Sequence, residues 1–125
     1  MKCKNIADVK PFLLGISLAA SLTVANHCAA LEMPQLARNN GCTDCHAIDK
    51  RVVGPAWIDV SRKYKGATKF LQNGKEYPLE EGLIRKVSKG GTGNWGEMGM
   101  PPNDSNGSKQ AAIKELVQFV LGLSR

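Results

Sequence analysis

The chain has 125 residues, the size of a single domain. Seventeen Lys and Arg against eleven Asp and Glu give a formal net charge of +6. The basic residues are scattered along the chain, which argues against a nucleic-acid-binding arm, so we expect no nucleic-acid partner. The glycine-rich stretch KGGTGNWG lacks the strand and helix that a phosphate-binding loop requires.

Residues 1–30 have the three-part pattern of a secretory signal peptide. A leader with Lys2, Lys4 and Lys10 precedes an uncharged stretch of small and apolar residues that ends in HCAALE. A retained membrane anchor is the rival interpretation, but polar residues dilute the stretch. A lipid anchor on Cys28 is disfavoured because His27 precedes it. We expect cleavage after Ala30, export to the periplasm and no stable membrane insertion afterwards.

The remaining residues, 31–125, form the predicted functional domain. Without the leader's three Lys and one Asp, the 17 Lys and Arg become 14 and the 11 Asp and Glu become 10, which gives this domain a net charge of +4. Cys42, Cys45 and His46 are then the only cysteines and histidine left. A domain this small buries a modest core, so we expect a disulfide, a metal or a cofactor to complete its interior.

A short helix is predicted over residues 34–40, with Pro34 at its first turn and Gly41 at its end. The stretch GCTDCHAI follows at 41–48 and allows three interpretations. A redox disulfide is expected in a βαβ context, which is not evident here. A structural zinc site needs four ligands, whereas only three Cys and His residues remain after cleavage. Covalent haem attachment has the signature C-x-x-C-H. This spacing puts both thiols on one side of a turn, from which they can bind the two porphyrin vinyl groups, while His46 supplies the proximal nitrogen.

Further helices are predicted over AWIDVSRKYK (56–65), over 79–89 and from about Ser108 to the C-terminal end. The third has apolar residues on one face, Glu80 and Glu81 early and Lys86 and Lys89 late, as the helix dipole favours. No convincing strand is evident. The pattern therefore predicts an all-α fold with about four short helices.

The second axial position of a haem iron would need another donor. Met33, Met98, Met100 and the lysines are the candidates. Met33 lies just before a helix and is interpreted as packing. Met98 and Met100 lie in the glycine-flanked loop GEMGMPPND, where a core-facing role is a weak explanation, and the two prolines after Met100 stiffen the segment.

At this point the chain resembles the class I cytochromes c, specifically the short monohaem periplasmic type of denitrifying and nitrifying bacteria. The matching motifs are NGCTDCHAID (40–49), VVGPAW (52–57), GTGNWGEMGMPPN (91–103) and the closing FVLGL. The resemblance implies the small cytochrome c fold, wrapped around one covalently bound haem c. It also implies that the iron is held by His46 and Met100, with Met98 as the alternative ligand.

The resemblance assigns further residues one at a time. Pro55 would accept a hydrogen bond from the His46 ring at its carbonyl. Trp95 would donate its indole N–H to a haem propionate, and Lys86 stands where related proteins often have an arginine near a propionate. Asn103 would donate a hydrogen bond toward the methionine sulfur. The stretch 67–82 is longer than in this family, and we expect a surface loop there.

The function implied is that of a periplasmic electron carrier, not an enzyme, which shuttles single electrons between respiratory redox partners. Basic residues would steer this monomer toward protein partners with acidic docking patches. They are Arg62, Lys63, Lys65, Lys69 and Lys75. The alternatives are a haem subunit of a larger complex, and a haem protein that reacts with small gases or peroxide after displacement of its methionine.

Overall fold

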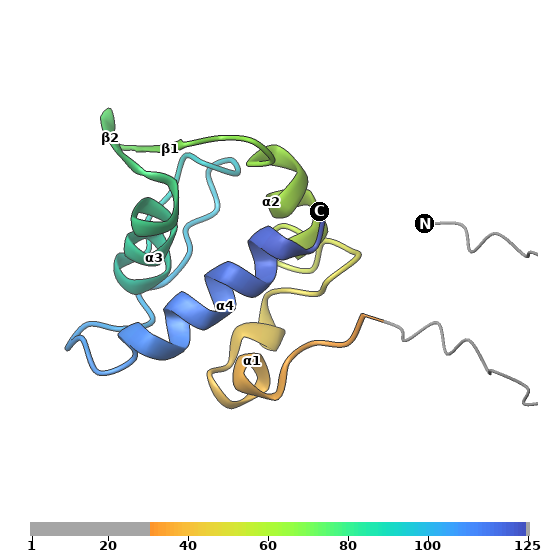
Figure 1. The fold of residues 1–125 in the computed structure, drawn as a ribbon. Coiled ribbons are helices and arrows are strands. Elements are labelled where there is room, and N and C mark those ends of the chain that lie inside the picture. The colour runs from red at the N-terminus through yellow and green to blue at the C-terminus, as the bar shows by residue number, and fades with distance from the viewer. Residues whose placement is uncertain (1–30, 125) are drawn as a thin grey trace, which may run out of the picture. The chain divides into compact units, whose positions relative to one another are not determined.

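The computed structural model describes residues 31–124, and the predicted signal peptide with Cys3, His27 and Cys28 lies outside them. The described part is a helical domain with one small sheet (Figure 1). Its elements are α1 (Gln35–Asn39), the 3-10 helix η1 (Cys42–Asp44), α2 (Trp57–Lys63), β1 (Lys69–Gln72), β2 (Lys75–Pro78), α3 (Leu79–Lys89) and α4 (Gln110–Gly122). The four predicted helices are all present, and α3 has the predicted bounds.

Proline or glycine residues lie directly at the ends of α1 and α3. Pro34 and Pro78 directly precede α1 and α3, where the missing N–H of proline costs no helical hydrogen bond. Gly90 follows α3 with a φ of 72°, a left-handed conformation that glycine adopts without strain. A Cβ at Gly90 would also collide with the backbone around Met100. The chain therefore turns sharply after α3 and runs close beside the segment that carries Met100.

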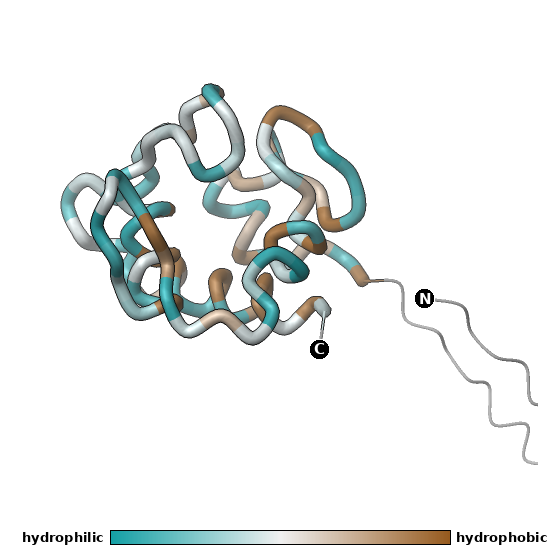
Figure 2. The backbone as a smooth tube through the Cα atoms, turned by 90° about the horizontal axis from the view of Figure 1, so that it is seen from above, coloured by the Kyte–Doolittle hydropathy of each residue, from teal (hydrophilic) through white to brown (hydrophobic). Residues whose placement is uncertain are grey.

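Helix α4 lies across the middle of the domain and contacts α1, α2 and α3 (Figure 1). One core cluster joins α1 and α4: Ala37 and Leu116 are buried together, with Leu36, Phe119 and Val120 packed against them. The first and last helices therefore pack against each other. Met33 also packs here, as expected. Hydrophobic residues occur along the chain in short stretches separated by hydrophilic ones (Figure 2).

The prediction of a surface loop over residues 67–82, without any strand, is wrong. β1 and β2 pair in antiparallel register, with Phe70 opposite Tyr77, and a two-residue turn joins them. Asn73 and Gly74 form that turn with φ angles of 50° and 76°, which is the left-handed geometry of the commonest hairpin connection. Residues along β1 alternate between exposed and buried. Phe70 is 1% exposed and belongs to a second core cluster with Leu83 and Val117 of α3 and α4.

Candidate functional site

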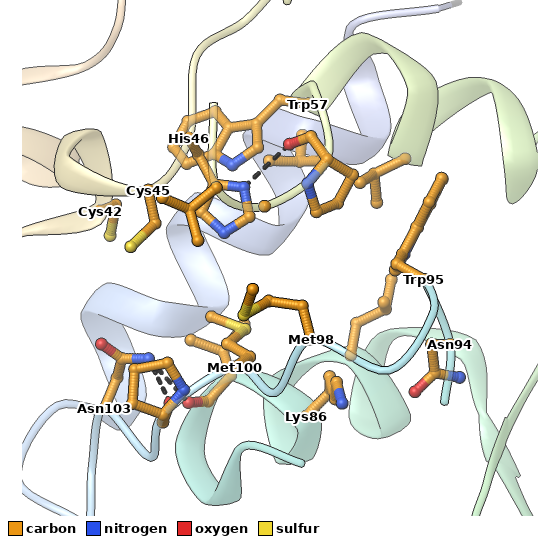
Figure 3. Close-up of a pocket in the computed structure, with 18 of the residues that line it drawn as sticks. Cys42, Cys45, His46, Trp57, Lys86, Asn94, Trp95, Met98, Met100 and Asn103 are labelled. Carbon is orange, nitrogen blue, oxygen red and sulfur yellow. Dashed lines mark hydrogen bonds between the residues drawn. The ribbon is translucent and has the colours of Figure 1, made fainter. Parts of the chain in front are cut away.

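A single cavity gathers all the residues that the sequence analysis assigned to the site. It lies between α3, α4, the segment 41–57 and the segment 91–103 (Figure 3). Apolar side chains from the two long helices form much of its wall, among them Leu83, Val87, Leu116, Val117 and Val120. The predicted residues Cys42, Cys45, His46, Pro55, Lys86, Trp95, Met100 and Asn103 all line it, together with Met98.

The C-x-x-C-H motif forms one end and one wall of this cavity. The chain folds back on itself through η1, so that the backbone N–H of His46 donates to the carbonyl of Cys42 over 3.0 Å. Both Cys42 and Cys45 are free thiols, partly buried at the same end of the cavity (Figure 3). Burial raises the pKa of the Cys42 thiol. Within residues 31–124, no group of three or more His, Cys, Asp or Glu side chains is arranged to hold a metal ion.

The His46 ring is held in one orientation by its neighbours. Its Nδ1 atom lies 2.9 Å from the carbonyl oxygen of Pro55, an arrangement in which Nδ1 carries the proton and donates it. The other ring nitrogen, Nε2, is then free as a donor of electrons to a metal and faces the cavity (Figure 3). Gly54 packs against the ring so closely that a Cβ there would collide with it. The indole of Trp57 lies 6.3 Å from the imidazole between ring centroids.

Two methionines face His46 from the opposite wall. Met98 and Met100 both extend from the 91–103 segment into the space between that segment and His46 (Figure 3). Met98 is 65% exposed, whereas Met100 is partly buried. The backbone of Met100 is also tied to Gly91 by two mutual hydrogen bonds of 2.9 and 3.0 Å. Met100 is therefore the more firmly held of the two, and its identity as the ligand stays a prediction.

The remaining predicted residues, Lys86, Trp95 and Asn103, also line the cavity. Lys86 is buried, donates from Nζ to the carbonyl of Gly91, and has its pKa lowered by that burial. Trp95 lies in the segment 91–103, and the Lys63 ammonium lies 4.4 Å from the centroid of its ring. Asn103 donates from Nδ2 to the carbonyls of Val87 and Pro101. A hydrogen bond from Asn103 to a methionine sulfur would therefore need its amide to turn, and it stays a prediction.

Two contacts at the site were not predicted from the sequence. Gly54 makes room for the imidazole, and Lys63 holds the loop by donating to the carbonyl of Asn94 over 2.6 Å. The glycine directly before Pro55 in VVGPAW was a usable signal, because a glycine beside a functional side chain often marks a close approach. Lys63 gave no such signal, since its partner is 31 residues away.

The donor set fits a covalently bound haem. Two free thiols lie at one end of an apolar cavity, and an oriented imidazole faces two thioethers across it. Thiols can form bonds to the porphyrin vinyl groups, and imidazole and thioether are common axial ligands of haem iron. The apolar wall suits a large flat hydrocarbon ring, and it would expose hydrophobic surface to water without one.

No protein-family model matches the chain. The chain is 41% identical over 103 residues to cytochrome c-551 of Allochromatium vinosum, a match that covers 82% of this chain and 96% of that protein. It is 35% identical to cytochrome c-552 of Hydrogenobacter thermophilus, covering 92% and 99% of the two chains. The crystal structure of Nitrosomonas europaea cytochrome c552 matches the fold with a TM-score of 0.58 at 35% identity, covering 71% of this chain and 96% of that one.

These similarities extend over nearly the whole length of the relatives, and the C-x-x-C-H motif, the oriented imidazole and the apolar cavity agree with them. The chain thus belongs to the class I monohaem cytochromes c of the c-551 and c-552 type, which are electron carriers with covalently bound haem c.

Proposed function

We propose that this cytochrome c carries single electrons with a haem iron held by His46 and Met100, and that it works in the periplasm between respiratory protein partners. The observation that supports this most directly is the placement of an oriented imidazole and a tethered thioether on opposite walls of one apolar cavity. His46 and Met100 together would leave no position on the iron for a substrate, which favours electron transfer over enzymatic chemistry.

The haem, when bound, supplies one-electron chemistry, and the chain's own residues prepare the environment for it. Cys42 and Cys45 would form the thioether bonds. Pro55 keeps the proton of His46 on Nδ1 and so keeps Nε2 available as a ligand. The apolar side chains of α3 and α4 would exclude water from around a bound haem, which would lower the reorganisation that accompanies a change of its charge.

The partners are proposed to carry acidic docking patches. Arg62, Lys65 and Lys75 are exposed basic residues that would attract such a patch during diffusional encounter. Four of the five predicted steering residues also have local partners. Lys69 pairs with Glu76 over 2.6 Å and Arg62 with Asp59 over 3.5 Å, while Lys63 and Lys65 donate to the carbonyls of Asn94 and Ser124. We further propose that the carrier is a monomer.

None of the helices within residues 31–124 has the length and apolar character needed to span a membrane.

The ligation is tested by visible spectra of the purified protein in both oxidation states. We expect the weak far-red band of ferric His/Met ligation at neutral pH, and no change in the ferrous spectrum when carbon monoxide is added, because both axial positions are filled. Absence of the far-red band together with carbon monoxide binding would instead favour an open iron and a protein that reacts with small gases or peroxide.

The proposed export is tested by the N-terminus of the native protein. If residues 1–30 are a cleaved signal peptide, mass spectrometry of protein isolated from its natural host is expected to find a chain that begins near Leu31 and carries the mass of one haem. A membrane-bound species that retains residues 1–30 would show that the stretch is an anchor, and it would leave the haem site unaffected.

A further inference from the structure

The hairpin β1–β2 sends one buried polar side chain toward the segment that carries the methionines. Gln72, the last residue of β1, is 8% exposed and donates from Nε2 to the carbonyl of Gly90 over 3.1 Å. Its Oε1 atom is buried without a hydrogen-bond partner. Burying an unpaired amide oxygen costs free energy, so an apolar residue would serve this position better if the hairpin needed only to pack. The useful part of Gln72 is therefore its donor to Gly90.

Gly90 links this hydrogen bond to the backbone of Met100. It directly precedes Gly91, whose N–H donates to the Met100 carbonyl over 2.9 Å and whose carbonyl accepts the Met100 N–H over 3.0 Å. Gly90 is closely packed against the Met100 segment, because a Cβ at Gly90 would collide with the Met100 carbonyl and approach the carbonyl carbon of Pro101 to 2.9 Å. A shift of Gly90 away from the hairpin would therefore move the backbone of Met100 as well.

A second tie joins the hairpin to the same segment a few residues later. Asn94 donates from Nδ2 to the backbone carbonyl of Leu71 over 2.8 Å, and its own carbonyl accepts from Lys63 of α2. Leu71 and Gln72 are neighbours on β1, so adjacent residues of one strand hold both Gly90 and Asn94. These two hydrogen bonds hold the segment 90–94 near both of its ends.

We propose that the hairpin β1–β2 is a positioning element for the second axial ligand, with Gln72 and Asn94 as the positioning residues that keep the methionine thioether in the cavity. This inference rests on the proposed methionine ligation. A loop opens by local unfolding more easily than the whole domain does, and fixing its backbone from outside reduces the population of the opened state. The hairpin occupies the stretch that is longer here than the family resemblance leads one to expect.

The test compares Gln72→Leu and Asn94→Ala with a control on the same strand, Leu71→Ala. Leu71 is 58% exposed, and its alanine variant keeps the carbonyl that accepts from Asn94. Heating the ferric holoprotein while following the far-red band and far-UV circular dichroism separates ligand loss from global unfolding. In both positioning variants the band is expected to disappear at a lower temperature than the helical signal. At one temperature below global unfolding, the fraction of ferric protein without the band should be roughly fivefold that of the wild type, because one hydrogen bond fewer holds the closed loop.

The control variant should lose the band and the helical signal as the wild type does. If Gln72 has only a structural role, a different result is expected. Gln72→Leu removes a buried unpaired oxygen, and the far-red band and the helical signal would then be lost with the same temperature difference between them as in the wild type. If both positioning variants behave like Leu71→Ala, the inference is wrong while methionine ligation stands. If the wild type lacks the far-red band, methionine ligation itself is wrong and the inference fails with it. Should Gln72→Leu fail to fold, Asn94→Ala decides alone.

Discussion

Replacing Cys42 and Cys45 together with alanine is expected to change the haem retained by the denatured chain from one per molecule to none. The two thiols are the only cysteines within residues 31–124, and they are free and lie at the same end of the cavity. Thioether bonds survive denaturation, whereas axial ligands are released when the fold is lost. The measurement is the mass of the chain after acid–acetone extraction, for the wild type and the double variant.

The matched control for this variant is Asp44→Ala. Asp44 lies between the two cysteines and is exposed, so its replacement should leave one haem on every denatured chain. A single variant, Cys42→Ala, should retain haem through the remaining thioether. Covalent attachment through the two cysteines would be contradicted if extraction removes haem from the wild type, or if the double variant still carries it.

The attachment motif could be read from the sequence because its chemistry is local. The spacing of Cys42, Cys45 and His46 within one turn was enough to predict covalent haem, and the structure places all three on one cavity. The helix over residues 79–89 was equally accessible, since apolar periodicity, a preceding proline and a following glycine all mark the same bounds. These features depend on neighbouring residues, which a single sequence displays directly.

The hairpin was missed although a local signal for it existed. Asn73–Gly74 is the dipeptide preferred in two-residue hairpin turns. The strands have only four residues each and contain no run of β-branched side chains, so the stretch did not look like a sheet. The ties from Gln72 to Gly90 and from Lys63 to Asn94 gave no signal at all, because tertiary packing alone brings these partners together.

Met100→Ala is expected to remove the far-red band of the ferric protein, change the spin state of the iron and let carbon monoxide bind the ferrous protein. Met98→Ala is expected to do none of these. Met100 is tied to Gly91 by two backbone hydrogen bonds and is followed by two prolines, whereas Met98 is 65% exposed. A weak thioether ligand needs a backbone that stays in place through redox cycling, and only Met100 has one.

Met98→Ala is therefore the matched control, since it removes the same side chain from the same wall of the cavity two residues away. The ligand choice also sets the potential, because a neutral thioether favours ferrous iron more than an imidazole does. Met100→His should then lower the reduction potential by on the order of a few tenths of a volt, within the range of about 0.8 V that axial ligands cover. Absorption spectra of both alanine variants and redox titration of the histidine variant measure these effects. Loss of the band in Met98→Ala with its survival in Met100→Ala would assign the ligand to Met98, and an unchanged potential in Met100→His would agree with that assignment.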